Sequence, residues 1–260
     1  MMIKEPFYEL EVKTRNCSIE ILINDLPVFS FYEEGNIAVD YPINTAIIRN
    51  GDQSMQVRLF SQNGNNISND AACELKVYVK EANIDGAQRD LIYNVPDITF
   101  FDKTVPVFIE KLKFKADIAY NNNGWYNSID LKTIDENRLF NELKEYMLKI
   151  TSIYNLKDAK GYNTLYSDRI KEHNNSFYLT PSEIRDNEEE IFSGVPQKIE
   201  GLDIDLYKLV FYGDNKLVSL QMKNQPPGFV FESENKDEYG FTEMVLFHKK
   251  DISSPLTPIR

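Results

Sequence analysis

Histidine, cysteine and the motifs built on them are scarce in this sequence. It has two histidines, His173 and His248, and two cysteines, Cys17 and Cys73, among 260 residues. It contains no nucleophile elbow, no phosphate-binding loop and no dinucleotide fingerprint. These absences exclude a histidine-rich metal site and leave no assignable catalytic, cofactor-binding or metal-binding residue. We therefore expect a protein that acts by binding, without covalent chemistry and without a required cofactor.

Positive charge and long apolar runs are also lacking. The chain has 29 Lys and Arg against 41 Asp and Glu, a net charge of −12. The residues up to 120 carry 12 basic and 18 acidic side chains and the remainder 17 and 23, so both halves are acidic. Nucleic acid needs a clustered basic face and is not expected as a partner, whereas a basic protein suits this surface. No window approaches the roughly 18 continuous apolar residues of a membrane span.

The first residues enter strand-type sequence without the apolar segment of a signal peptide. The sequence therefore predicts a cytoplasmic protein, or a periplasmic one if a leader has been removed. Both cysteines fall in predicted strands, where each is expected to be a small buried hydrophobic side chain. A Cys17–Cys73 disulfide stays open as the alternative for an exported chain.

The other candidates for chemistry each have a simpler structural explanation. His173 follows Glu172 near the predicted end of a helix. Its structural explanation is a protonated ring that interacts with the helix dipole, and its functional alternative is a catalytic base. His248 ends a predicted strand beside two lysines. Acidic residues gather at 186–190 and 200–205, which suggests calcium, but their spacing matches no EF-hand loop and such runs are usually solvated.

The first 120 residues alternate with the period of a β-strand between turn signals. Asn24-Asp25 predicts a hairpin over residues 17–31, and Pro27 places its second arm at an edge or a strand start. The other predicted strands cover residues 7–13, 37–41, 55–60, 73–80, 97–101 and 105–120. No helical pattern long enough to cover a sheet interrupts them, so we expect an antiparallel β-sandwich of the immunoglobulin-like or jelly-roll kind over residues 1–120.

A change of period marks a domain junction at residues 121–132. Asn121-Asn122-Asn123-Gly124 favours turn conformations, and Trp125, the only tryptophan, follows at once. We expect two separately folding domains, over 1–120 and 133–260. Trp125 is expected to be at least half buried and to anchor the junction.

The second half begins with helical periodicity and ends with strands. Thr133 and Glu136 match a capping box before a helix that extends to Tyr154, and Thr180 and Glu183 match another before a helix that ends near residue 192. A weaker helix is predicted over 158–173. Strands are predicted over residues 206–212, 217–222, 229–232 and 241–248. This order predicts an α+β domain with three helices packed on a four-stranded antiparallel sheet.

Two resemblances support this division. Residues 21–28, 39–44 and 50–59 resemble the strand-and-turn rhythm of immunoglobulin-like and galactose-binding-like sandwiches of bacterial proteins. The chain departs from that rhythm at Asp25, where a glycine would stand, and at Gln53 and Ser54, where an asparagine would fall, so no sugar-binding residue carries over. The order of elements in the second half is similar to small cone-shaped folds of the nuclear-transport-factor or cystatin type, which implies a fold and not a function.

Tyrosines of the second half are the best candidates for a ligand pocket. A tyrosine ring supplies contact area together with a hydroxyl, and core packing is the simpler explanation at helical spacing. The candidate pocket residues are Tyr162, Tyr166, His173, Tyr207 and Tyr212.

Three functions follow from the sequence. The first is a non-enzymatic acidic bacterial protein that binds another, basic protein, such as an immunity-type inhibitor of a toxin. The second is a small-molecule binder or an enzyme that uses a pocket in the C-terminal domain. The third is a carbohydrate-recognition module.

Overall fold

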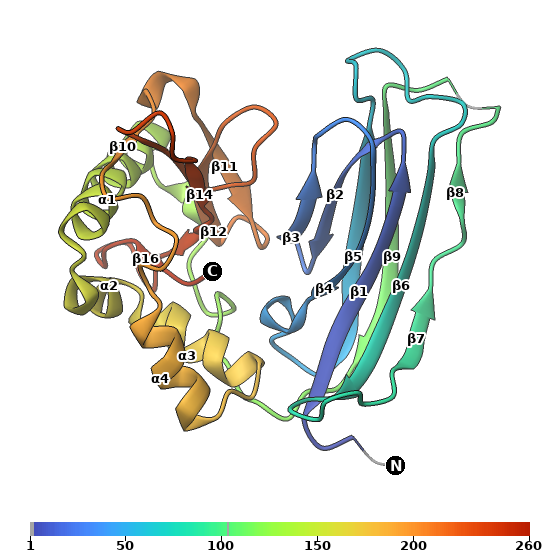
Figure 1. Ribbon diagram of the computed structural model, residues 1–260, viewed down its shortest axis with the longest axis horizontal. Helices are drawn as coiled ribbons and strands as arrows, with labels where there is room; N and C mark the ends of the chain where they lie inside the picture. The colour runs from blue at the N-terminus through green and yellow to red at the C-terminus, as the bar shows by residue number, and fades with distance from the viewer. Residues whose placement is uncertain (1–2, 103) are drawn as a thin grey trace. The chain divides into compact units, whose positions relative to one another are not determined.

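The computed structural model describes residues 3–102 and 104–260 (Figure 1). The chain divides into two compact units. Unit 1 comprises residues up to Asn122 together with Ser176–Tyr178, and unit 2 comprises Asn123–Asn175 and Leu179–Arg260. Over the described residues the chain is mostly β, with four antiparallel sheets and four α-helices. That each unit folds separately stays a prediction.

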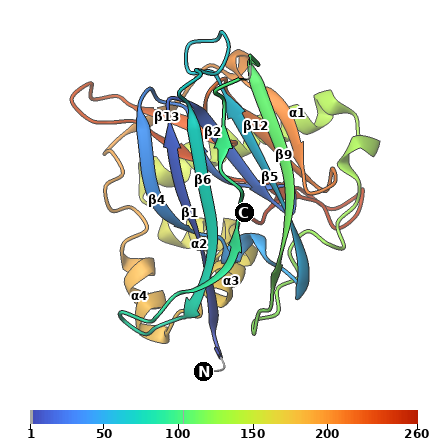
Figure 2. The ribbon, with the colours of Figure 1, turned by 90° about the vertical axis from the view of Figure 1, so that its right-hand side faces the viewer.

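Unit 1 contains two antiparallel sheets (Figures 1 and 2). The first has the order β4-β1-β6-β7, with β8 also paired to β6. The second has the order β3-β2-β5-β9. Their strands are β1 (Pro6–Arg15), β2 (Ser18–Ile23), β3 (Leu26–Phe31), β4 (Asn36–Pro42), β5 (Gly51–Phe60), β6 (Ala72–Glu81), β7 (Asp90–Asn94), β8 (Ile98–Thr99) and β9 (Val107–Ala116).

Buried apolar residues alternate along the strands. Because successive side chains of a strand point to opposite faces of its sheet, each sheet has one apolar face. On the first sheet the buried positions include Leu10 and Val12 of β1 and Leu75 and Val77 of β6. On the second sheet they include Ile19, Ile21 and Ile23 of β2 with Met55, Val57 and Leu59 of β5. The period-two pattern of the sequence therefore corresponds to the core of unit 1.

The predicted hairpin over residues 17–31 is present. β2 and β3 pair antiparallel, with Ile23 opposite Leu26. Asn24 and Asp25 fill the two-residue turn with φ of 52° and 58°, as a type I′ turn requires. β3 is the edge strand of its sheet, which accommodates Pro27 because an edge strand can lack one ladder donor.

The strand order differs from that of an immunoglobulin constant domain. There the first two strands share a sheet, whereas β1 and β2 lie in different sheets here. Asn50-Gly51 is a dipeptide typical of hairpin turns, but it does not join a hairpin here, because β4 pairs with β1 while β5 pairs with β2 and β9. Residues 21–59 thus resemble those sandwich domains in the residue types of their strands and turns.

The two cysteines are free buried thiols. Burial raises the pKa of Cys17 to about 11, and it also raises that of Cys73. The structure therefore does not contain the alternative, a disulfide between Cys17 and Cys73.

Unit 2 begins with helices whose boundaries correct two predictions. The helices are α1 (Glu136–Leu156), α2 (Ala159–Leu165), α3 (Ser167–Ser176) and α4 (Pro181–Glu189). The N-cap of α1 is Asp135, whose carboxylate accepts from the Arg138 amide at 2.9 Å. The proposed capping box at Thr133 is wrong, because Thr133 ends a short 3-10 helix and its hydroxyl donates to the Asp130 carbonyl.

The single helix predicted over 158–173 is two helices, because the chain breaks at Tyr166, the C-cap of α2. The capping box of α4 is confirmed. The Thr180 hydroxyl accepts from the Glu183 amide, and the Glu183 carboxylate accepts from the Thr180 amide at 2.7 Å. The helix ends at Glu189 and not near residue 192.

The prediction of one four-stranded sheet in unit 2 is wrong. Its strands form two antiparallel sheets, in the orders β10-β13-β14 and β11-β12-β15-β16. They are β10 (Ile199–Gly201), β11 (Lys208–Tyr212), β12 (Leu217–Gln221), β13 (Phe229–Ser233), β14 (Phe241–Glu243), β15 (Phe247–His248) and β16 (Thr257–Pro258). The segment predicted as one strand over 241–248 is divided at Leu246, whose amide and carbonyl bond to the backbone of residues 259–260. Its first part then pairs with β13 and its second with β12.

Candidate functional site

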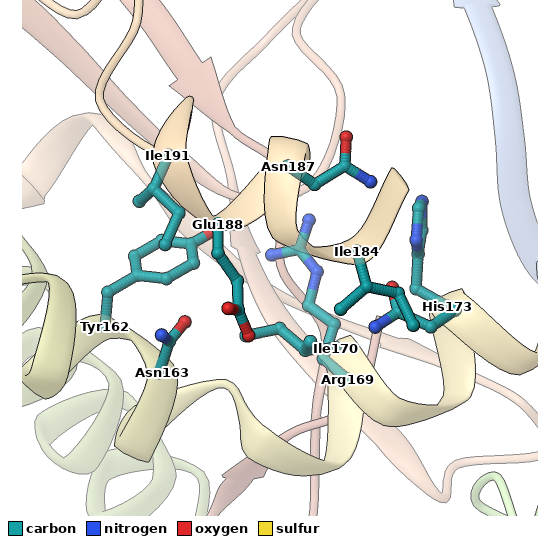
Figure 3. Close-up of a pocket in the computed structure, with 10 residues that line it drawn as sticks. Tyr162, Asn163, Arg169, Ile170, His173, Ile184, Asn187, Glu188 and Ile191 are labelled. Atoms are coloured by element: carbon teal, nitrogen blue, oxygen red, sulfur yellow. The ribbon is translucent and has the colours of Figure 1, made fainter. Parts of the chain in front are cut away.

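A cavity of about 280 Å³ lies among α2, α3 and α4 of unit 2 (Figure 3). Its walls combine three isoleucines with amide, charged and aromatic side chains. The lining residues are Tyr162, Asn163, Arg169, Ile170, His173, Asn174, Ile184, Asn187, Glu188 and Ile191.

Helical spacing and the break at Tyr166 bring these groups together. Asn187 and Glu188 lie three and four residues after Ile184, so all three residues lie on the same side of α4. Arg169 and His173 are likewise four residues apart on α3. Because α2 ends before α3 begins, residues of both helices can face the same cavity.

Arg169 is held by a polar network behind the cavity wall. Its Nη1 donates to Glu243 Oε1 at 2.7 Å, and the Tyr154 hydroxyl donates to Glu243 Oε2 at 2.6 Å. The side chain of Glu243 is 10% exposed and that of Arg169 is 28% exposed. Burial by itself lowers the pKa of Arg169, but the charge of Glu243, the neighbouring Tyr166 and Tyr162 and the hydrogen bond with Glu243 together raise it. The guanidinium is therefore a fixed cation at the cavity wall.

Tyr166 supports the same wall from the core. It is fully buried, its ring lies 4.6 Å from that of Tyr162, and the Arg169 guanidinium lies 5.2 Å from its ring centre. Its hydroxyl has no hydrogen-bond partner among the described residues. Burial raises its pKa well above the ordinary value, so it stays neutral. Tyr166 thus packs behind the cavity and does not line it.

His173 and Asn163 supply neutral polar groups. Burial lowers the pKa of His173, the charge of Arg169 lowers it further, and a hydrogen bond with Asn174 opposes both. The imidazole is accordingly neutral at pH 7. The Oδ1 atom of Asn163 is buried without a hydrogen-bond partner in the part of the chain that is described. An unpaired buried acceptor costs about 1–3 kcal/mol, which makes it a position for a donor to occupy.

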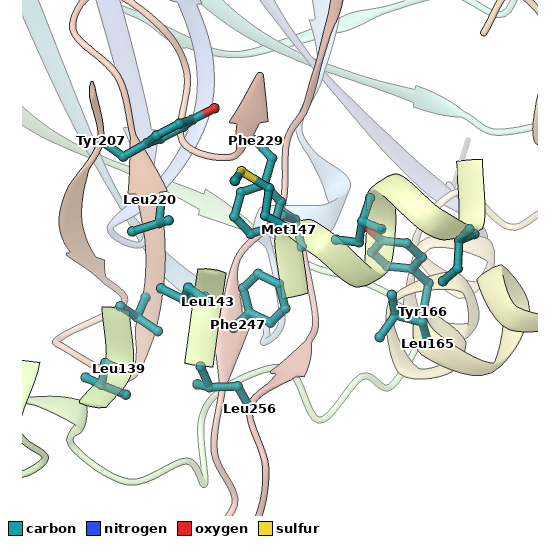
Figure 4. Packing of buried hydrophobic residues seen from close by; sticks show 14 of the residues in the cluster. Leu139, Leu143, Met147, Leu165, Tyr166, Tyr207, Leu220, Phe229, Phe247 and Leu256 are labelled. Carbon is teal, nitrogen blue, oxygen red and sulfur yellow. The ribbon is translucent and has the colours of Figure 1, made fainter. Parts of the chain in front are cut away.

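The five predicted pocket residues do not converge on one site. Tyr162 and His173 line the cavity, and Tyr166 lies behind it. Tyr207 and Tyr212 are not among the lining residues. Figure 4 shows Tyr166 and Tyr207 among the buried side chains of unit 2. The Tyr207 hydroxyl accepts from the Val230 amide at 2.8 Å, and Tyr212 ends β11 with its hydroxyl 3.4 Å from Gln221, so both serve the sheets.

Sequence reasoning missed Arg169, Asn163, Asn187 and Glu188. Their sequence signal is weak, since Asn and Glu on short helices are normally solvated. The one usable sign is the spacing of Tyr162, Tyr166 and Arg169, which places an arginine on the same helical side as two tyrosines. The contribution of α4 has no local signal.

His248 and Trp125 lie elsewhere in unit 2. His248 is buried, its Nδ1 lies 2.6 Å from the Ser128 hydroxyl, and burial together with Lys250 lowers its pKa. Trp125 is 5% exposed and lies under the Arg260 guanidinium at 5.2 Å. The expected burial of Trp125 is present, and its role as an anchor between domains stays a prediction.

The described residues contain no group of three or more His, Cys, Asp or Glu side chains that could hold a metal ion, including the acidic residues at 186–190 and 200–205. In the same residues no helix is long and apolar enough to cross a membrane.

Comparison with known proteins places this chain in no group: no protein-family model, no curated protein and no solved structure matches it.

Proposed function

We propose that this chain is a non-enzymatic binding protein whose ligand occupies the cavity among α2, α3 and α4. The observation that carries this proposal is the combination of isoleucine walls with a few placed polar groups, the usual make-up of a ligand site. Ligand pockets commonly enclose about 300–1,000 Å³. At about 280 Å³ this cavity suits a small ligand.

The lining favours binding over chemistry. Covalent catalysis needs a nucleophile within reach of a base. Among the described lining residues there is no serine, cysteine, threonine or lysine, and burial raises the pKa of Tyr162, so its phenol stays protonated. Arg169 and the amides are groups that orient a ligand.

A ligand screen with a blocked cavity tests this proposal. We expect a compound from a library of small polar metabolites to raise the melting temperature of the protein, because a ligand that binds only the folded state stabilises it. Ile184→Trp should fill the cavity and abolish that shift. Ile252→Trp is the matched control, since Ile252 is 62% exposed and does not line the cavity. If no compound shifts the melting temperature, or if Ile184→Trp binds as well as the control, the cavity is not the site.

A basic protein partner is the second candidate, and the surface of α4 favours it. This helix, described along its whole length, has no buried residue. It exposes Asp186, Glu188 and Glu189, and Glu190 follows directly. An inhibitor of a basic toxin domain would be one member of this class.

Salt dependence tests the second candidate. A partner captured from the native host should bind more weakly as ionic strength rises, because the Debye length falls from about 30 Å at 0.01 M to about 8 Å at physiological salt. The double variant Glu189→Lys/Glu190→Lys should weaken binding further. Affinity that changes with neither salt nor these substitutions would exclude an electrostatic interface on α4.

A further inference from the structure

We propose that the cavity binds a small zwitterion, a free amino acid being the ligand class. This inference rests on the proposed function and narrows it to one chemistry. It follows from the Arg169 cation, the Glu188 carboxylate and the unsatisfied amide oxygen of Asn163, which come to one cavity from different helices.

Arg169 forms the carboxylate-binding side. A guanidinium carries five N–H donors, and here Nη1 is directed to Glu243 Oε1. The side chain is 28% exposed and lines the cavity, so donors remain for a ligand. Figure 3 shows the guanidinium between α3 and α4, with His173 and Asn187 to one side of it. Arginine is the side chain best suited to a carboxylate, because its fork matches the two oxygens.

Asn163 and Glu188 form the ammonium-binding side. Glu188 lines the cavity from α4 and is exposed, and the ion pairs found among the described residues do not include it. Asn163 Oδ1 is buried and lacks a donor in the described part of the chain. In Figure 3 both side chains lie near Tyr162. An ammonium group offers three N–H donors, enough to satisfy both oxygens at once.

The two sides together select a zwitterion over a simple ion. Glu243 already compensates the charge of Arg169, so a simple cation would leave the remaining N–H donors of Arg169 without an acceptor. A simple anion would meet the carboxylate of Glu188. A molecule with both groups pairs with Glu188 and with those donors. Its apolar portion would contact Ile170, Ile184 and Ile191, which fits an amino acid with an aliphatic or aromatic side chain.

Matched ligands test the charge pattern directly. Calorimetric titration of the full chain would use leucine, phenylalanine and the ω-amino acid 4-aminobutyrate, which separate α- from ω-amino acids. Leucine amide lacks the carboxylate, and N-acetyl-leucine lacks the ammonium. We expect at least one amino acid to bind, and its two singly charged analogues to bind about tenfold more weakly or worse, since each loses a charge-assisted hydrogen bond.

Matched variants test the acceptor side. Glu188→Gln should weaken amino-acid binding by about tenfold, while Glu189→Gln, the neighbouring carboxylate that does not line the cavity, should leave it unchanged. Both positions are exposed, so neither variant is expected to affect folding. Equal binding of the amino acid and its analogues, or equal effects of the two variants, would overturn the zwitterion while leaving the cavity as a site for other compounds. A library in which nothing binds would instead overturn the proposed function.

Discussion

The ion pair between Arg169 and Glu243 gives the sharpest test of the structure beneath the cavity. The two side chains meet at 2.7 Å and are 28% and 10% exposed, respectively. Glu243 also accepts from the Tyr154 hydroxyl. Glu243→Gln keeps the size of the side chain and removes its charge, which leaves the Arg169 cation partly buried without a counterion.

The expected cost follows from this burial. Removing one partner of a fully buried ion pair destabilises a protein by about 3–5 kcal/mol. Water reaches part of Arg169, and the amide oxygen of Gln still accepts one hydrogen bond. We therefore expect Glu243→Gln to lower the free energy of unfolding by about 2 kcal/mol. The matched control is Glu234→Gln, because Glu234 pairs with Lys198 where the side chains are 50% and 64% exposed. Its cost should stay below about 0.5 kcal/mol.

Urea denaturation followed by Trp125 fluorescence measures both values. Trp125 is the only tryptophan and lies in unit 2 at 5% exposure, so its emission reports on the unit that contains the pair. Adding Arg169→Met completes a double-mutant cycle. The double variant should cost less than the sum of the single variants by about 1–3 kcal/mol, because neither charge then remains unpaired. Equal costs for Glu243→Gln and Glu234→Gln, or additive effects in the cycle, would refute the reasoning.

Three further measurements test other parts of the structure. Burial lowers the pKa of His248 in the folded state, so protons bind the unfolded state first. The stability that its neutral ring contributes is complete above about pH 6.5 and should fall as the pH drops, by at most about 1.4 kcal/mol per pH unit. The pKa of His173 is lowered too, but its side chain is exposed to solvent, so its contribution should be smaller. Urea midpoints at pH 7.5 and 5.5 check this, and His248→Gln should reduce the difference. Gly228→Ala should destabilise the protein by more than about 2 kcal/mol, because Gly228 has φ of 146° and the added Cβ would lie 2.1 Å from the Glu243 carbonyl oxygen; a variant with native melting temperature would contradict the close approach. The two cysteine thiols, both buried with raised pKa, should react with a thiol reagent only after denaturation, and rapid reaction of the native protein would contradict their burial.

The sequence by itself determined the features that depend on a few consecutive residues. Asn24 and Asp25 tolerate positive φ and therefore set a two-residue turn, and Pro27 then requires an edge strand. The capping box at Thr180 was predictable because both of its hydrogen bonds close within three residues. Alternation of apolar residues in the first half likewise identified most strands of unit 1.

Tertiary structure alone decided the features that join distant residues. The segment over 241–248 divides between two sheets because Leu246 bonds to backbone near residue 260, a contact that no periodicity encodes. Arg169 is fixed by Glu243, which lies 74 residues further along the chain. The cavity exists because α4 covers the groups that α2 and α3 present. Turns and caps are set by a few neighbouring residues. The cavity instead depends on packing between helices and strands, and the residues that stabilise this packing are far apart in the sequence.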